Sequence, residues 1–202
     1  MRPAVFLDRD GVLNEDTGYI HRIEDFRLYA GTGRALRRLH EAGYLLFLVT
    51  NQSGIGRGYF TVEAMERVHG FLESELDRHG VRLSRIYFAP EAPDQPSRGR
   101  KPSPRFLLDA RDEFGVDLSR SYMIGDKLAD LECGWNAGVR RSLLVRTGHG
   151  AQVERDAPDK LRRAVVVDDL PSAVAWILDQ APSGLGSDTA DRMGDGRREN
   201  CQ

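Results

Sequence analysis

The chain has 202 residues, 40% of them hydrophobic, and a formal net charge of −2 at pH 7. This length allows one domain of ordinary size, and a charge so close to neutral provides no basic field that would attract nucleic acid. The apolar run that ends at Leu7 is too short for a signal peptide, and no run approaches the ~20 residues that span a membrane. We therefore expect a cytoplasmic, monomeric protein with neither nucleic-acid nor membrane partners.

Short apolar runs alternate along the chain with segments of helical periodicity. Six runs are continuous, which is typical of strands buried on both faces: 4–7, 44–49, 86–89, 122–124, 142–145 and 164–167. Helical spacing predicts helices over 61–79, from 103 onward, over 128–137 and from 170 onward, with Thr61 and Gly138 as caps. Strands that alternate with helices predict an α/β fold, a Rossmann-like parallel sheet with helices on both faces.

The composition changes after residue 181. Residues 183–202 are rich in Gly, Asp, Ser and Arg, and their only large apolar residues are Leu185 and Met193. Such a segment buries too little apolar surface to offset the entropy of ordering it. We predict one folded domain over 1–181 and a disordered tail over 182–202.

The first polar cluster, Asp8-Arg9-Asp10-Gly11-Val12, directly follows the first predicted strand. Two carboxylates this close are costly to desolvate unless something compensates their charge. A divalent cation does so, and Mg²⁺ prefers one or two carboxylates together with phosphate and water. The alternative is a loop with solvated acidic side chains.

Two further clusters offer groups that suit phosphate. Residues 49–58, Val-Thr-Asn-Gln-Ser-Gly-Ile-Gly-Arg-Gly, supply hydroxyl, amide and glycine backbone donors after the second strand. Residues 100–104, Arg-Lys-Pro-Ser-Pro, place cations before a predicted helix, which the helix dipole disfavours unless an anion lies between them. The alternatives are a polar turning loop and a solvated basic loop.

The fourth cluster, Ile-Gly-Asp-Lys-Leu-Ala-Asp at 124–130, ends another strand. Asp126 is suited to complete a cation site, and Asp130 to hold a neighbouring lysine or backbone N–H. The alternative for Asp130 is an exposed acid on the helix surface. Because ligands of parallel sheets bind beyond the C-terminal ends of the strands, the four clusters predict one site there.

In order and spacing the clusters resemble the haloacid dehalogenase superfamily of phosphatases. The family pattern is Asp-x-Asp-x-Thr/Val, then a Ser or Thr after a strand, then a Lys, then Gly-Asp-x-x-x-Asp. The residues that match it, in chain order, are Asp8, Asp10, Thr50, Lys101, Gly125, Asp126 and Asp130. The resemblance covers roughly residues 4–180, and the short intervals between the clusters imply a minimal cap.

The resemblance implies a Mg²⁺-dependent reaction in two steps. Asp8 would attack phosphorus and form an aspartyl-phosphate, and Asp10 would act as general acid and then as general base. Thr50 and Lys101 would hold the transferring phosphoryl oxygens.

The resemblance also implies the metal ligands and the contacts to the rest of a small phosphorylated sugar. Mg²⁺ would be held by Asp8, by the backbone carbonyl of Asp10 and by Asp126, while Asp130 would orient Lys101 or a neighbour of Asp126. The implied substrate contacts are Asp16, Thr17, Gly18, Tyr19, Asn51, Gln52, Ser53, Arg100 and Lys127.

Within the superfamily the chain is similar to the D-glycero-D-manno-heptose-1,7-bisphosphate 7-phosphatases, through residues 6–14, 18–21, 50–58, 121–127 and 145–148. This similarity implies removal of the 7-phosphate. The alternatives are a histidinol-phosphate or other small sugar-phosphate phosphatase, and a non-catalytic phosphate-binding module, although such a module should have lost Asp8 or Asp10. A nucleic-acid end phosphatase does not fit the net charge.

One stretch departs from the family pattern. Both related branches usually carry a structural zinc loop before the lysine, of the form Cys-Pro-His…Cys-x-Cys-Arg-Lys-Pro. Here Ala89, Glu91, Ser97 and Gly99 stand at the ligand positions. Because a structural zinc needs four nitrogen or sulfur ligands, we expect no structural zinc, and the prolines of this loop would stiffen it instead.

Overall fold

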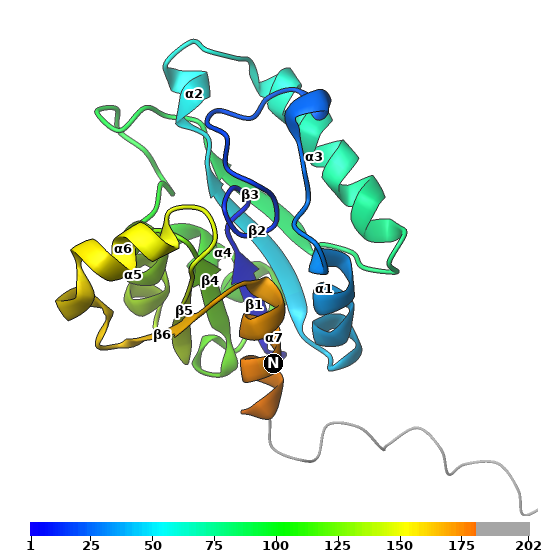
Figure 1. Cartoon of the computed structure of the whole chain (residues 1–202), viewed down its shortest axis with the longest axis vertical. Coiled ribbons are helices and arrows are strands. Elements are labelled where there is room, and N and C mark those ends of the chain that lie inside the picture. Colours follow the sequence, from blue (N-terminus) through cyan, green and yellow to red (C-terminus); the bar gives the residue numbers. More distant parts are fainter. Residues whose placement is uncertain (181–202) are drawn as a thin grey trace, which may run out of the picture.

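A six-stranded parallel sheet forms the centre of the computed structural model, which describes residues 1–180 (Figure 1). Its order is β3-β2-β1-β4-β5-β6, and the strands are β1 (Ala4–Leu7), β2 (Leu45–Asn51), β3 (Arg85–Ala89), β4 (Tyr122–Gly125), β5 (Arg141–Val145) and β6 (Ala164–Val167). The chain runs outward from β1 to β3, returns to β4 beside β1, and runs outward again to β6. The topological switch point, where such sheets bind ligands, therefore lies between β1 and β4.

Helices cover both faces of this sheet. They are α1 (Thr32–Glu41), α2 (Ser53–Gly56), α3 (Val62–Asp77), α4 (Arg105–Phe114), α5 (Leu128–Ala137), α6 (Gly150–Asp156) and α7 (Leu170–Asp179), with 3-10 turns at Ile23–Asp25, Leu118–Arg120 and Pro158–Leu161. Val5 and Leu7 of β1 pack with α1, α3 and α7, whereas Ala4 and Phe6 pack with α4 and α5. This alternation follows the two-residue period of a strand.

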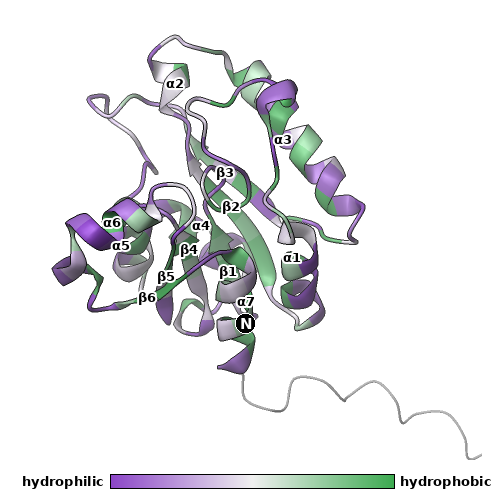
Figure 2. Ribbon diagram, in the orientation of Figure 1, coloured by the Kyte–Doolittle hydropathy of each residue, from purple (hydrophilic) through white to green (hydrophobic). Residues whose placement is uncertain are grey.

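The strands are apolar on both faces because both faces are covered. Figure 2 shows the hydrophobic colour along the central strands and hydrophilic segments on the outer helices. All four residues of β1 are fully buried, as is Ile124 of β4 beside them. The carboxyl ends of these strands are thus held by a rigid core.

The structure confirms the predicted fold class, with all six strands and the four predicted helices present. Thr61 caps α3 by accepting the N–H of Ala64 at 3.3 Å, and Gly138 ends α5 in the left-handed region at φ +79°. The second strand extends two residues beyond its predicted end, because Thr50 and Asn51 pair with β3. The short helices α2 and α6 had no apolar periodicity to predict them.

Two expectations concern the limits of the chain. No helix within residues 1–180 is long and apolar enough to cross a membrane. The predicted tail over 182–202 lies outside the described residues, so it and the domain boundary at 181 remain predictions.

Candidate active site

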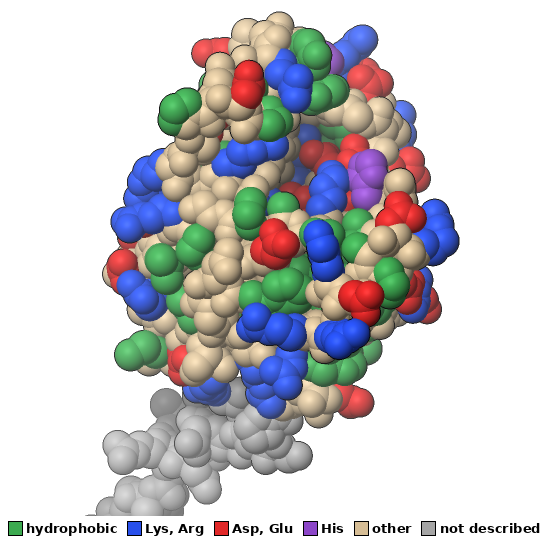
Figure 3. All heavy atoms as spheres, turned by 90° about the vertical axis from the view of Figure 1, so that its left-hand side faces the viewer, with side chains coloured by type: hydrophobic (Ala, Val, Ile, Leu, Met, Phe, Trp, Pro, Cys, Tyr) green, Lys and Arg blue, Asp and Glu red, His purple; other side chains and the backbone are tan. Residues whose placement is uncertain are grey.

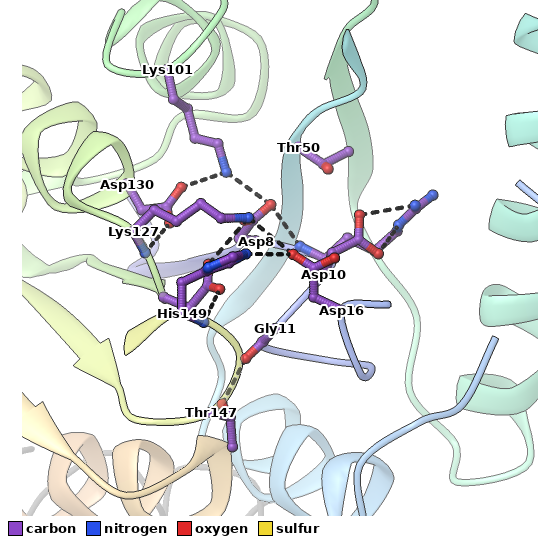
Figure 4. Close-up of polar contacts among 12 residues, drawn as sticks. Asp8, Asp10, Gly11, Asp16, Thr50, Lys101, Lys127, Asp130, Thr147 and His149 are labelled. Atoms are coloured by element: carbon purple, nitrogen blue, oxygen red, sulfur yellow. Dashed lines mark hydrogen bonds and ion pairs between the residues drawn. The ribbon is translucent and has the colours of Figure 1, made fainter. Parts of the chain in front are cut away.

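Asp8 is the first residue after β1. Its backbone N–H donates to the carbonyl of Ile124 at 3.0 Å, which fixes its position at the switch point. Its Oδ1 accepts hydrogen bonds from Lys101 Nζ at 2.8 Å and from the backbone N–H of Arg9 at 2.8 Å (Figure 4). The described residues donate no hydrogen bond to Oδ2. Burial raises the pKa of Asp8, and the opposing effect of Lys101 does not cancel this rise.

Lys101 joins Asp8 to Asp130. Its Nζ lies 2.6 Å from Asp130 Oδ1 and donates to the carbonyl of Val49 at 2.7 Å, so its three N–H groups all have partners. Burial alone would lower the pKa of Lys101, but Asp130 and Asp8 outweigh burial and hold the pKa above its usual value. Asp130 also accepts the backbone N–H of Lys127 through Oδ2 at 2.9 Å. It is buried, so it is not the exposed helix acid that the sequence left open.

Asp126 follows β4 and is fully buried beside Asp8. Its Oδ2 accepts the backbone N–H of His149 at 2.9 Å, and its Oδ1 has no hydrogen-bond partner within the described part of the chain. Burial, and then the charge of Asp8, raise the pKa of Asp126 to about 8. Since a buried carboxylate oxygen rarely lacks a hydrogen bond, Oδ1 is suited to be a cation ligand, and Lys127 Nζ, 3.9 Å away, is too far to donate to it.

The residues present fit a magnesium ion. Carboxylate oxygens of Asp8, Asp126 and Asp130 all lie within 4.8 Å of one another. Mg²⁺ prefers hard, anionic oxygen donors, and this set supplies them, including Asp126 Oδ1, which accepts no hydrogen bond from the described residues. A second group, Asp16, Asp126 and His149, is equally compact but offers an imidazole nitrogen in place of an oxygen.

Asp10 faces a different set of partners. The guanidinium of Arg9 donates to both of its oxygens, from Nε to Oδ1 at 3.0 Å and from Nη2 to Oδ2 at 2.9 Å. Asn14 donates to Oδ1 at 2.9 Å, and Gln52 donates to Oδ2 at 3.2 Å. The carboxylate thus accepts four hydrogen bonds from three side chains, and it still lines the cavity.

Residues at the end of β2 form the next part of the site. Thr50 is buried, and its hydroxyl oxygen accepts from Gln52 Nε2 at 2.8 Å. Asn51 exchanges two hydrogen bonds with the backbone of Lys101, at 3.0 and 3.2 Å. The second cluster of the sequence therefore fixes the third, although 50 residues separate Asn51 and Lys101.

These groups line one cavity of about 300 Å³. Its lining contains most of the predicted site residues and some that the sequence did not indicate: Asp8, Asp10, Asp16, Gly18, Tyr19, Thr50, Asn51, Gln52, Ser53, Gly54, Lys101, Lys127, Ala129, Asp130 and His149. Lys127 Nζ lies 3.1 Å from Asp16 Oδ2. Figure 4 shows Lys127 on the side of the site opposite Thr50. A hollow of this size suits a small ligand.

Two predicted substrate contacts are placed elsewhere. Arg100 donates through Nη1 to the carbonyl of Glu91 at 3.1 Å, within the proline-rich loop, and is not part of the cavity lining. Thr17 is exposed and is likewise outside the lining. For Arg100 the reason is local, because the loop backbone offers the guanidinium an acceptor.

His149 is a cavity residue that sequence reasoning missed. Its Nε2 lies 3.3 Å from Asp16 Oδ2, and its backbone N–H binds Asp126. The preceding hydroxyl, Thr147 Oγ1, donates to the carbonyl of Gly11 and ties this loop to the first cluster. The position of the segment after the fifth strand, at the same edge of the sheet, was the available signal.

The proline-rich loop before Lys101 is held by hydrogen bonds. Ser97 Oγ donates to Glu91 Oε2 at 2.6 Å and accepts the backbone N–H of Arg100 at 3.1 Å. Glu91 and Ser97 occupy two of the positions where the related branches carry zinc ligands. A carboxylate and a hydroxyl thus connect the two ends of this loop directly.

Comparison with known proteins gives consistent results. The HAD-hydrolase-like family model matches residues 99–173. A D-glycero-beta-D-manno-heptose-1,7-bisphosphate 7-phosphatase of Haemophilus ducreyi is 42% identical over 177 residues, which cover 84% of this chain and 97% of that protein. A D-glycero-D-manno-heptose-1,7-bisphosphate 7-phosphatase of Thermosynechococcus vestitus is 40% identical over 189 residues, which cover 87% of this chain and 95% of that protein.

The chain belongs to the haloacid dehalogenase superfamily. It is a phosphatase of that superfamily, as its motifs predicted. The crystal structure of a D,D-heptose 1,7-bisphosphate phosphatase from B. bronchiseptica, complexed with magnesium and phosphate, superimposes with a TM-score of 0.82 at 30% identity, covering 89% of this chain and 99% of that one. The resemblance drawn from the four clusters is confirmed.

Proposed function

We propose that this phosphatase is Mg²⁺-dependent, acts through an aspartyl-phosphate on Asp8, and removes the 7-phosphate of D-glycero-D-manno-heptose 1,7-bisphosphate. The observation that carries the proposal is the environment of Asp8. Lys101 binds Oδ1, while Oδ2 receives no hydrogen bond from residues 1–180 and is the oxygen left for attack. The relatives named above support the substrate.

The first step transfers the phosphoryl group to the enzyme. Asp8 Oδ2 attacks phosphorus, and the bond from phosphorus to the sugar oxygen breaks. Asp10 enters this step protonated and gives its proton to that oxygen, so the sugar leaves as an alcohol and Asp10 is left as a carboxylate. Thr50 binds the phosphoryl oxygens through its hydroxyl, and Lys101 binds them once it exchanges one of its present hydrogen bonds for the substrate; both stabilise the negative charge of the transition state.

The second step returns the enzyme to its starting state. Asp10, now a carboxylate, takes a proton from a water molecule as that water attacks phosphorus. The bond from Asp8 to phosphorus breaks and inorganic phosphate is released. Asp130 keeps Lys101 in place in both steps through its 2.6 Å ion pair.

The metal would be held by Asp8, by Asp126 and by the backbone carbonyl of Asp10. When bound, Mg²⁺ reduces the repulsion between the Asp8 carboxylate and the anionic phosphate. Asp126 Oδ1 accepts no hydrogen bond from residues 1–180, and Lys127 Nζ is 3.9 Å away, which supports this placement.

The rest of the substrate would contact the remaining cavity wall. Gly18, Tyr19, Asn51 and Ser53 all line it. Lys127 adds a cation at the rim, with Asp16 as its partner. Because all of these groups come from a single chain, we further propose that the monomer is active.

A phosphate-release screen tests the substrate. It should include both anomers of the heptose bisphosphate, histidinol phosphate and fructose 1,6-bisphosphate at equal concentrations. We expect one heptose anomer to have the highest kcat/KM. If histidinol phosphate is preferred by about tenfold, a margin of roughly 1.4 kcal/mol in transition-state binding, the heptose assignment is wrong and the phosphatase class stands.

A further inference from the structure

Arg9, the middle residue of the Asp-x-Asp segment, is fully buried beside the cavity. Each of its three guanidinium nitrogens has a partner. Nε and Nη2 bind the two oxygens of Asp10, Nη2 also donates to the carbonyl of Ile20 at 3.0 Å, and Nη1 lies 3.3 Å from His69 Nε2. A buried arginine that donates from two nitrogens to one carboxylate fixes the plane of that carboxylate as well as its distance from the guanidinium.

The carboxylate of Asp10 has no acceptor site to spare in this arrangement. Two ionised oxygens offer about four lone pairs. Arg9 and Asn14 occupy Oδ1, and Arg9 and Gln52 occupy Oδ2. As a general acid, Asp10 must carry a proton on one of these oxygens and direct it at the leaving-group oxygen, which requires that one donor withdraws.

Gln52 is the donor best placed to withdraw. Its bond to Asp10 is the longest of the four, at 3.2 Å, and the same Nε2 also donates to Thr50 at 2.8 Å. Gln52 lines the cavity, whereas Arg9 lies behind Asp10 in the protein interior. Loss of the longer bond would leave Gln52 satisfied by Thr50 and would open Oδ2 toward the substrate.

His69 anchors Arg9 from behind. It is a buried residue of α3, which contributes no residue to the cavity lining. Since a guanidinium offers only N–H groups, His69 Nε2 must be the acceptor in this contact, which requires a neutral ring. Burial, and then the charge of Arg9, lower the pKa of His69 to about 3, so the ring is neutral at ordinary pH.

We propose that Arg9, anchored by His69, is a positioning residue that fixes the orientation of the Asp10 carboxyl, and that Gln52 is the donor the leaving-group oxygen displaces. The proposal rests on the general-acid role proposed above for Asp10. A lysine in place of Arg9 would keep the charge but would not bind both oxygens in one plane.

The dependence of the rate on the leaving group tests this role. The kcat/KM value reports steps up to the first irreversible one, here the transfer to Asp8. A sugar phosphate needs its leaving oxygen protonated, whereas the nitrophenolate of 4-nitrophenyl phosphate leaves without help. A fault in positioning Asp10 therefore lowers kcat/KM for the sugar phosphate and spares the aryl phosphate.

We expect Arg9→Lys and His69→Leu to lower kcat/KM for the sugar phosphate by about 10- to 100-fold, a partial loss of the ~10²–10⁴ that general acid catalysis provides. The value for the aryl phosphate should change less than about threefold. His69→Gln retains an acceptor oxygen and should recover most of the loss. Asp10→Asn should show the largest imbalance between the two substrates.

Arg98→Lys is the matched control. Arg98 also binds one aspartate through two nitrogens, at 2.6 and 2.9 Å, but its partner Asp109 lies in α4, outside the cavity. This variant should change neither value.

The outcomes separate the two proposals. Equal losses on both substrates in Arg9→Lys and His69→Leu would show that Arg9 is only structural and would overturn the inference. If Arg9→Lys does not fold, as judged by thermal melting, His69→Leu with its glutamine rescue decides. An unchanged substrate ratio in Asp10→Asn would instead refute the general-acid role of Asp10.

Discussion

Asp8 and Asp10 are two residues apart, yet they lie in opposite surroundings. Asp8 contacts the compact cation of Lys101 on one oxygen, and the acids Asp126 and Asp130 lie close to it. Asp10 is bound on both oxygens by a planar guanidinium and by two amides. A lysine neutralises charge and leaves an oxygen free, which suits a nucleophile. A guanidinium fixes orientation, which suits a group that must direct a proton.

The two halves of the site, one around Asp8 and the other around Asp10, also differ in their balance of charge. On the Asp8 side, burial raises the pKa of both Asp8 and Asp126, so this half is short of positive charge until a cation binds. On the Asp10 side, Arg9 balances the single carboxylate directly. The two halves should therefore respond differently to mutation, to pH and to magnesium.

The largest effect should come from Asp8→Asn. The amide keeps the size of the side chain but removes the attacking oxygen anion, so turnover should fall by more than about 100-fold, as expected for loss of a covalent nucleophile. Phosphate release measures this, with circular dichroism to show an intact fold. Residual activity above a hundredth of the wild-type value would contradict the assignment.

Lys101→Met should destabilise the protein as well as inactivate it. The variant leaves Asp8 and Asp130 buried without their cation, and breaking a buried pair costs about 3–5 kcal/mol. Urea unfolding without added metal measures this free energy. Lys160→Met is the control, because Lys160 is exposed and its loss should cost almost nothing. A Lys101→Met protein as stable as the wild type would mean that Asp8 and Asp130 do not depend on this cation.

Magnesium should stabilise the protein more as the pH rises. The raised pKa of Asp126, about 8 against 3.8 for an unperturbed Asp, means that the folded state holds a proton that the unfolded state lacks in this range. Without metal, the stability that Asp126 contributes is therefore lost as pH rises toward about 8. Because Mg²⁺ binds the ionised form, its effect on Tm should be a few degrees larger near pH 8 than near pH 5.

Asp126→Asn is the control for this measurement. It should abolish the magnesium-dependent shift in Tm. Without metal, it should also reduce the loss of stability that the wild type shows as the pH rises toward about 8. A shift that is the same at both pH values, or that survives in the variant, would place the ion elsewhere.

The smallest effect should come from the proline-rich loop. Ser97→Ala removes the hydrogen bond to Glu91 and should cost about 0.5–1.5 kcal/mol in unfolding free energy.

The metal requirement tests the same loop in another way. Chelation of all metal by EDTA, followed by addition of Mg²⁺ alone, should restore full activity to the wild type. A requirement for zinc as well would show that this loop binds metal after all.

Residues at or just after the carboxyl end of a strand were predictable from the sequence. Asp8, Thr50 and Asp126 are adjacent to continuous apolar runs, and the C-terminal ends of parallel strands meet at one edge. That rule brings these three residues together. Lys101 does not follow a strand directly, and its two backbone hydrogen bonds with Asn51 bring it to this edge.

Other features depend on tertiary contacts that no local pattern carries. His69 belongs to a helix with ordinary amphipathic spacing, and only the packing of α3 brings its Nε2 to Arg9. Arg100 matched a family position, but its guanidinium binds a backbone carbonyl of its own loop. Side-chain direction within loops is set by such neighbours, so spacing along the chain did not predict it.

The central claim is that Asp8 becomes phosphorylated during turnover. Acid quenching of the enzyme within the first turnover of its sugar phosphate, followed by peptide mass spectrometry, tests it directly. We predict a phosphate adduct on the peptide that carries Asp8, which forms before inorganic phosphate is released and is absent from Asp8→Asn. Full turnover without that adduct, or with the phosphate on another residue, would contradict the account.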